Sequence, residues 1–232
     1  MNPTVIDVLG EYYFLISLSG TDEEPDNLNL TGKHKVYLFP SLTADFGVRS
    51  YSKAGALCSY DPAAEVSAAA YLSLKQGLPL DEFIFETPVG FLKISRTGRD
   101  IFEIVIPKCK VLFTDIAEIH GCPIQYSDIL VGDVLRVVRA ENIDWADPLA
   151  LSALLSVGRY LPTALLFSSV NDGMIEMSSY TDFNPSPPSR VLLYAAAALA
   201  NQGQDRILTS RDARLSVKAA YSAVSLKIKC EI

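Results

Sequence analysis

The residues of this chain that could do chemistry gather at the starts of two similar segments. Residues 62–77 begin with proline and end on Gln-Gly, and residues 188–203 do the same with an equal number of residues between. Carboxylates beside such starts suit proton transfer, whereas an arginine suits the binding of a carboxylate or phosphate. The candidates for catalysis are Asp61, Glu65 and Asp182, and those for substrate binding are Tyr60, Tyr180, Ser189 and Arg190.

Each candidate also has a purely structural interpretation. Asp61 stands where an N-cap carboxylate would accept backbone N–H bonds. Glu65 suits a first helical turn because it complements the helix dipole, and Asp182 lies in a loop, where turn-forming Asp is common. Arg190 conflicts with the dipole at a helix start unless it faces an anion, and this conflict favours a binding role.

The two repeated segments are predicted to be Ala-rich, largely buried helices. Proline is tolerated at the first helical position because its missing N–H has no partner there, and glycine takes the left-handed conformation after the last turn. A strand-like run precedes each helix and a two-strand pattern follows it. We therefore expect two similar lobes in an α+β fold, residues 1–115 with central helix 62–76 and residues 116–232 with central helix 188–202.

Shorter patterns place the remaining elements. Apolar and β-branched runs predict strands over residues 5–9, 12–18, 36–39, 46–51 and 56–58, and residues 21–31 form a polar surface loop. Residues 116–133 show no sustained periodicity and are predicted to be the crossover between the lobes. Asp147-Pro148 starts a helix through about Val157. Asn171-Asp172-Gly173 predicts a hairpin turn.

Composition and missing motifs limit the function classes. The 232 residues carry a formal net charge of −7, which argues against general affinity for nucleic-acid backbones. The chain shows neither a secretory leader nor an apolar run long enough to span a membrane. Its four widely spaced cysteines suit reduced thiols in a cytoplasmic protein, without a zinc set. Because no phosphate loop, dinucleotide fingerprint, nucleophile elbow or HExxH motif is present, we expect no cofactor and no metal.

At this point the sequence resembles the diaminopimelate epimerase-like superfamily, which includes proline racemase and the phenazine-biosynthesis isomerases. The resemblance rests on Phe85-Glu-Thr-Pro-Val-Gly90 after the first helix, on the opening Val8 to Phe14 strand pair, and on the matching order in the second half. It implies two pseudo-symmetric lobes, each a β-barrel-like mixed sheet around a central helix. The active site would then lie in the inter-lobe cleft, where both helix starts meet.

The chain departs from this family at the residues that carry its best-known chemistry. The racemases use one cysteine at each helix start, but Pro62 and Pro188 stand at those positions here. The phenazine-type members use acidic residues and a histidine in the first helical turn, and that turn has no histidine in this chain.

The resemblance therefore implies a cofactor-independent isomerase or cyclase-like enzyme that is not a two-cysteine racemase. It would act on a small organic acid or biosynthetic intermediate, expected to be anionic, with a homodimer as one possible assembly. The alternative is a catalytically inert ligand-binding or scaffold protein that retains the epimerase fold.

Overall fold

The computed structural model describes residues 4–18, 32–58, 60–139, 147–184, 187–201, 207–220 and 222–232. Contacts between residues divide the chain into two compact units. The first comprises Met1–Val105, Ser189–Val191 and Leu226–Ile232, and the second comprises Ile106–Pro188 and Leu192–Ser225. The last strand thus starts in the second unit and ends in the first. The surface loop expected at residues 21–31 and the Gln-Gly end of the second repeat lie outside the described residues.

A ring of strands forms the first unit. Its elements are β1 (Thr4–Val8), β2 (Glu11–Ser17), β3 (His34–Phe39), β4 (Phe46–Tyr51), β5 (Glu82–Thr87), β6 (Gly90–Arg96), β7 (Ile101–Pro107) and the end of β15 (Ala223–Glu231). Neighbouring strands pair in this order, and β15 also pairs with β1, so that the ring closes. The pairs β2–β3 and β4–β5 are parallel, whereas β1–β2, β3–β4, β5–β6 and β6–β7 are antiparallel. The described part of this unit is therefore a mixed β-barrel.

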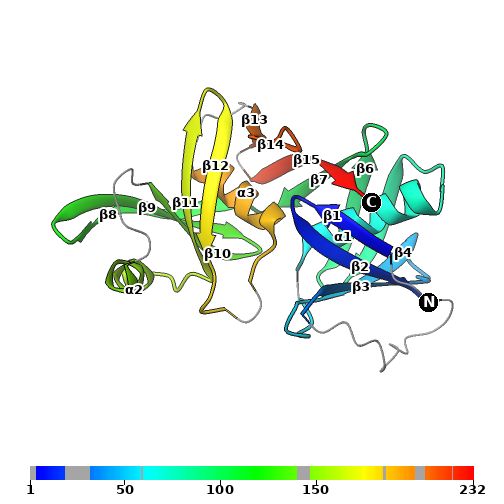
Figure 1. Ribbon diagram of the computed structural model, residues 1–232, viewed down its shortest axis with the longest axis horizontal. Coiled ribbons are helices and arrows are strands. Elements are labelled where there is room, and N and C mark those ends of the chain that lie inside the picture. The colour runs from blue at the N-terminus through cyan, green and yellow to red at the C-terminus, as the bar shows by residue number, and fades with distance from the viewer. Residues whose placement is uncertain are drawn as a thin grey trace. The chain divides into compact units, whose positions relative to one another are not determined.

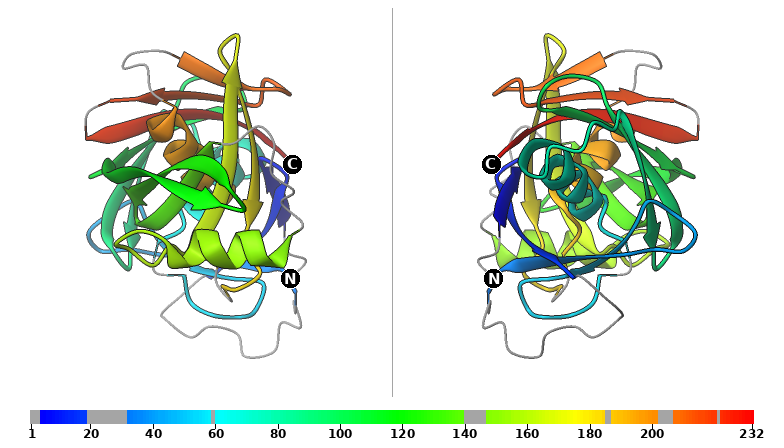
Figure 2. Two further views of the ribbon diagram at one scale, coloured as in Figure 1. Left: turned by 90° about the vertical axis from the view of Figure 1, so that its left-hand side faces the viewer. Right: turned by 90° about the vertical axis from the view of Figure 1, so that its right-hand side faces the viewer.

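One helix runs through this barrel. Helix α1 (Pro62–Ala70) contacts β1, β2, β3, β4 and β6, and all of its residues are buried (Figure 1). Figure 2 (right) shows it nearly end-on inside the strands. Small alanine side chains let the helix backbone approach the sheet closely, which explains how a helix fits here. A π-helical turn η1 (Tyr71–Lys75) extends α1, and Gly77 follows with a φ of +69°, which is the glycine stop that the sequence predicted.

The strands of the second unit also pair in chain order. This unit contains β8 (Lys110–Ile119), β9 (Cys122–Val131), β10 (Asp133–Arg139), β11 (Ala164–Asn171), β12 (Met174–Tyr180), β13 (Ile207–Ser210) and β14 (Leu215–Ala219), with α2 (Pro148–Ser156) and α3 (Arg190–Ala200). The strands pair in the order β8, β9, β10, β11, β12, β13, β14. Residues Arg190 and Val191 of α3 belong to the first unit and the rest of the helix to the second. The predicted turn at Asn171-Asp172-Gly173 joins β11 to β12, with φ values of +50° at Asp172 and +78° at Gly173.

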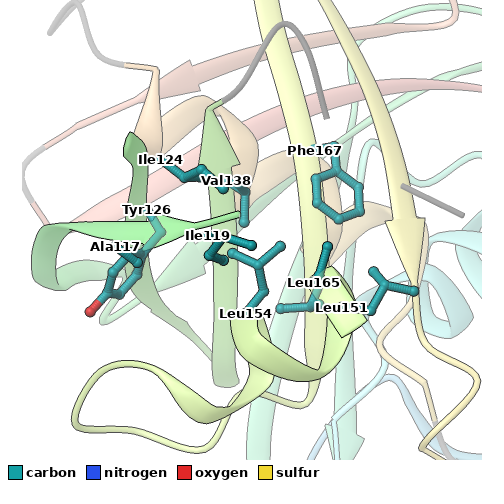
Figure 3. Close-up of a cluster of buried hydrophobic side chains, with 10 residues drawn as sticks. Ala117, Ile119, Ile124, Tyr126, Val138, Leu151, Leu154, Leu165 and Phe167 are labelled. Atoms are coloured by element: carbon teal, nitrogen blue, oxygen red, sulfur yellow. The ribbon is translucent and has the colours of Figure 1, made fainter. Parts of the chain in front are cut away.

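Helix α2 covers part of this second sheet. Leu151 and Leu154 of α2 point toward β8 and β11, where they meet Ile119, Leu165 and Phe167 (Figure 3). The helix starts at Asp147-Pro148 as predicted. At its other end, the buried Arg136 of β10 donates from Nη1 to the carbonyl oxygen of Leu154 at 2.5 Å. The sheet therefore binds both an apolar face and the C-terminal carbonyls of α2.

Two of the local predictions were wrong. Residues 116–133, predicted to be an aperiodic crossover, belong mainly to the antiparallel hairpin of β8 and β9, whose turn has φ values of +53° at His120 and +74° at Gly121. The pattern was hidden because most of β8 is exposed and a β-bulge shifts its register between Val111 and Phe113. The strand predicted at residues 56–58 is reduced to a bridge between Tyr51 and Leu57. None of the described helices is long and apolar enough to cross a membrane.

Candidate active site

The described candidate residues of the first unit converge at the start of α1. Asp61, Tyr60 and Glu65 come from this helix start, and Ser189 and Arg190 come from the separate segment 189–191 that joins the same unit. The β1–β2 hairpin supplies the other side of the site. Figure 1 shows β1 and β2 running past α1. Sequence positions more than 120 residues apart are thereby brought together in one cluster.

Asp61 occupies the N-cap position of α1 but does not make the expected cap. Its side chain forms no hydrogen bond of good geometry with the helix amides. The residue is 6% exposed, and burial together with the charge of Glu11 raises the pKa of Asp61 to about 7. The nearby Ser189 hydroxyl and the Ala63 and Ala64 amides lower this pKa in part, although Ser189 Oγ makes no well-formed hydrogen bond with any residue that the structure describes. A carboxyl with this pKa both gives and takes protons near neutral pH.

Glu65 lies one helical turn after Asp61 and is 4% exposed. Its Oε2 atom has no hydrogen-bond partner among the described residues. Burial, and then the charge of Asp61, hold the pKa of Glu65 well above its usual range. The two acids therefore form a buried pair that prefers to hold protons.

Glu11 and Tyr13 belong to the site, although the sequence analysis did not single them out. Both come from β2, and the Tyr13 hydroxyl donates toward Glu11 Oε2 at 3.2 Å and toward Asp61 Oδ1 at 3.5 Å. Burial raises the pKa of Glu11, and burial with the charges of Asp61 and Glu11 raises the pKa of Tyr13 well above its usual range. A charged residue directly after the Leu9-Gly10 turn was the available sequence signal.

Arg190 is attached to the hairpin that carries Glu11. Its Nη1 donates to the carbonyl oxygen of Leu9 at 2.7 Å, and its backbone N–H donates to Glu11 Oε2 at 2.9 Å. Gly10 makes room for this contact, since a Cβ atom there would lie 2.9 Å from Arg190 Nη1. The guanidinium is exposed beyond this one bond, so the predicted role of Arg190 as an anion clamp stays a prediction.

His34, at the start of β3, is the other residue that the sequence did not reveal. It is 7% exposed, its ring lies 5.1 Å from the Tyr13 ring, and its Nδ1 atom has no hydrogen-bond partner among the described residues. Burial, followed by the charge of Lys53, lowers the pKa of His34 to about 4. The imidazole is therefore neutral at physiological pH. In the sequence it was visible only as part of the short basic run 33–35.

Two predicted site residues lie in the second unit. Asp182 is exposed in a turn, and Tyr180 at the end of β12 packs against the apolar cluster under α2, with its ring 5.7 Å from that of Phe183. Their roles in catalysis and binding stay predictions. In the described part of the chain, no three His, Cys, Asp or Glu side chains are arranged to hold a metal ion.

Comparisons with known proteins place the fold. No model of a protein family matches the chain, and no curated protein sequence matches it. Among solved structures, a PhzF-family phenazine biosynthesis protein from Enterococcus faecalis matches with a TM-score of 0.62 and 12% identity over 98% of this chain and 94% of that chain. A hydroxyproline epimerase from Agrobacterium vitis, with bound trans-4-hydroxy-L-proline, matches with a TM-score of 0.67 and 12% identity over 98% and 89%. A methylitaconate-delta-isomerase matches with a TM-score of 0.52 and 9% identity over 99% and 92%.

These likenesses confirm the expected fold. The chain has the α+β fold of the phenazine biosynthesis protein, the epimerase and the isomerase that it matches. At such low identities the likeness establishes the fold, and the chemistry has to be argued from the residues at the start of α1.

Proposed function

We propose that this protein is a cofactor-independent isomerase or cyclase-like enzyme in which Asp61 transfers a proton to or from a small organic acid. The observation that carries the proposal is the buried Asp61 carboxyl at the start of α1, whose pKa of about 7 suits both halves of a proton transfer. Structural neighbours with the same fold are an epimerase that holds trans-4-hydroxy-L-proline and a methylitaconate isomerase, and both of these compounds are small organic acids.

The surroundings of Asp61 support this chemistry. The start of a helix presents free N–H groups and a positive dipole end, which stabilise a carboxylate or a developing enolate. Arg190 adds an exposed guanidinium, which is held by the bond from Nη1 to the carbonyl oxygen of Leu9. Glu65 lies one turn further along the same helix, with a raised pKa and one oxygen that has no partner among the described residues, and it offers a hydrogen-bond donor when it is protonated. We infer that the substrate carries an anionic group at this helix start while Asp61 removes or returns a proton.

The proposal excludes a two-thiol mechanism. Cys58 is partly exposed and precedes α1, but Pro62 and Pro188 occupy the positions where the racemases of this fold carry their cysteines. A carboxyl of raised pKa replaces the thiol as the proton carrier. Reduced thiols suit a cytoplasmic protein, and the two repeated helices suit a chain of two related lobes, residues 1–115 and 116–232. We retain both as parts of the proposal.

Proton exchange with solvent tests the proposal without knowledge of the product. The protein is incubated in D₂O with trans-4-hydroxy-L-proline, L-proline and a panel of small carboxylic acids that carry a C–H bond next to a carbonyl. Loss of that C–H signal is followed by proton NMR. We expect exchange with at least one acid, and Asp61→Asn should slow it by about 10²- to 10⁴-fold, the usual contribution of a positioned acid or base.

Glu65→Gln and Asp182→Asn complete the set of carboxyl variants. Unchanged exchange rates in all three variants would overturn the acid–base mechanism. Binding of an acid from the panel without any exchange would instead support the alternative, a ligand-binding protein that has kept the fold and lost the chemistry. The loss of both cysteines is the observation that favours this second candidate.

A further inference from the structure

The Tyr13 hydroxyl lies between two carboxyl groups of the candidate active site. It is 3.2 Å from Glu11 Oε2 and 3.5 Å from Asp61 Oδ1, and Tyr13 itself is fully buried. A hydroxyl group donates one hydrogen bond and accepts others, so it donates to only one of these carboxyls at a time. It can accept from the other carboxyl whenever that group is protonated. The three groups therefore form a chain along which a proton can move.

The chain runs from a partly exposed end to a buried end. Glu11 follows a surface turn and is partly exposed, whereas Asp61 is 6% exposed. An acid that transfers a proton to a bound substrate must later recover one, and a buried acid needs a path to do so. Glu11 is also held in place, because its Oε2 accepts the backbone N–H of Arg190 at 2.9 Å and Arg190 Nη1 binds the carbonyl oxygen of Leu9.

We propose that Glu11 and Tyr13 form a relay that exchanges protons between solvent and Asp61. This inference rests on the proposed role of Asp61 as the group that gives and takes the proton. In the recharging direction, Tyr13 donates its hydroxyl proton to the Asp61 carboxylate while its oxygen accepts the proton of the Glu11 carboxylic acid. The Glu11 carboxylate then recovers a proton from water. Two O–H bonds form and two break in the concerted step, one forms and one breaks in the last step, and Tyr13 ends as the neutral phenol with which it began.

Other charged and titratable groups face the relay and set its working range. The charge of Arg190, followed by that of Lys53, favours the ionised form of Glu11, while the charge of Glu11 disfavours the ionised form of Asp61. Glu65 adjoins Asp61, the neutral His34 packs on the Tyr13 ring, and Cys58 lies near enough to affect the Tyr13 hydroxyl. Because Tyr13 resists ionisation, the two proton movements must be concerted and do not pass through a phenolate.

Tyr13→Phe tests the relay, since it removes the hydroxyl and keeps the ring against His34. A matched control is Tyr71→Phe, because Tyr71 is also buried and its hydroxyl accepts from Gln76 Nε2 at 2.6 Å, outside the relay. In protein labelled with ¹³C at the side-chain carboxyls, the pH titrations of the Glu11 and Asp61 signals report on the hydroxyl that lies between them. We expect Tyr13→Phe to raise the midpoints of these titrations, because the two carboxylates lose a shared hydrogen-bond donor, and Tyr71→Phe to preserve them. Midpoints that are unchanged in Tyr13→Phe overturn the relay, and this measurement needs no substrate.

A kinetic experiment uses an organic acid whose C–H proton the enzyme is found to exchange with solvent. Tyr13→Phe and Glu11→Gln should each lower kcat by about 10²-fold with KM unchanged, the smaller end of the range for a positioned proton-transfer group. The double variant should be no slower than either single variant, because both break the same path. A small buffer acid such as imidazole should restore the rate of Glu11→Gln. Additive losses, or a wild-type kcat in Tyr13→Phe, would show that the hydroxyl has only a structural role. If no acid is exchanged at all, the proposed function fails while the titration result still stands.

Discussion

The dipeptide Asp-Pro starts two helices of this protein, but the Asp side chain has different surroundings in each. Asp147-Pro148 begins α2, and Asp147 accepts the backbone N–H of Leu149 at 2.9 Å in the ordinary manner of an N-cap. Asp61-Pro62 begins α1, yet the Asp61 side chain makes no such bond and is buried beside Glu11, Tyr13 and Ser189. Proline sets the start of both helices. The environment of the preceding carboxylate decides whether that residue stabilises the helix or remains available for chemistry.

The α2 region also shows what a structural buried carboxylate looks like. Asp128 is fully buried, and Arg136 binds it through two bonds, Nε to Oδ1 at 2.6 Å and Nη2 to Oδ2 at 2.9 Å. The same guanidinium binds the carbonyl oxygens of Leu154 and Tyr160. Among the described residues at the start of α1, no buried cation faces Asp61 or Glu65 in this way. A buried acid that is fully paired holds structure, whereas one that has no cation keeps its proton and can transfer it.

The largest loss of stability is expected from Arg136→Ala. The substitution leaves Asp128 buried without its partner and frees the C-terminal carbonyls of α2, so the free energy of unfolding should fall by about 3–5 kcal/mol. Urea denaturation followed by circular dichroism measures this loss. Asp61→Asn, which removes a buried carboxyl with no cation partner, should not lower the free energy of unfolding at neutral pH.

A double variant keeps this prediction testable if Arg136→Ala does not fold. Asp128→Leu with Arg136→Met replaces the ion pair by apolar side chains, and such replacements are often neutral or stabilising. The double variant should therefore recover most of the lost stability. If Arg136→Ala is as stable as wild type, the contrast between the two buried acids is wrong.

The second prediction concerns the pH dependence of stability. The pKa of Asp61 is about 7 in the folded protein and near 3.8 in an unfolded chain, so between these values the folded state holds a proton that the unfolded state has released. Stability from this group is therefore lost as the pH rises from about 4 to 7. Asp61→Asn removes the slope, and its advantage over wild type should grow from near zero at pH 4 to a few kcal/mol at pH 8, on the order of 1.4 kcal/mol per pKa unit.

His34 provides the opposite sign as a control. Its pKa is lowered to about 4 from 6.5, so the unfolded state binds the extra proton and stability is lost as the pH falls from about 6.5 to 4. His34→Gln should remove that acid-side loss and leave the Asp61 slope visible. Unfolding free energies at intervals between pH 4 and 8 test both variants. Parallel curves for wild type and Asp61→Asn would contradict the raised pKa of Asp61.

Much of this architecture is predictable from local signals. Pro62, Gly77 and the alanines between them define α1 and its stop, and Asn171-Asp172-Gly173 defines a hairpin, because each depends on the backbone preferences of a few adjacent residues. The β8–β9 hairpin was missed because its exposed, bulged strand has no clean alternation. His120-Gly121, a pair with positive φ values, was the only local sign of its turn.

Only the α1 side of the candidate active site is predictable from the sequence. Asp61 and Glu65 were selected because they adjoin a recognisable helix start. Glu11 joins them through Arg190, which is 179 positions away, and Tyr13 joins through a contact that spans 48 positions. No local pattern encodes such contacts. The absence of the cap bond at Asp61 was likewise hidden, since Asp61-Pro62 and Asp147-Pro148 are the same dipeptide.

The third prediction tests how closely the Arg136 network is packed. Gly158 has a φ of +84°, and a Cβ atom there would lie 2.7 Å from Arg136 Nη2 and 3.2 Å from Asp128 Oδ2. Gly173 has a similar φ of +78° with nothing within 4 Å of such a Cβ atom. Both alanine variants carry the same backbone strain, so Gly158→Ala should be less stable than Gly173→Ala by about 1–3 kcal/mol, the usual cost of overpacking. Equal stabilities would show that the guanidinium moves aside freely.

The smallest effect is expected at the cap of α2. Asp147→Ala removes the bond to the Leu149 N–H and the 3.1 Å contact with His120 Nε2, and should lower the free energy of unfolding by about 1 kcal/mol. Asp147→Asn retains a capping oxygen and should lose only a few tenths of that amount, because Asn and Asp cap about equally well. At Asp61 the order should reverse for catalysis: Asn keeps the shape of the side chain but abolishes proton transfer. Two outcomes would contradict this contrast: loss of isotope exchange in Asp147→Asn, or normal isotope exchange in Asp61→Asn. Either one would show that a buried Asp without a cap bond is not the feature that distinguishes the catalytic Asp-Pro helix start from the structural one.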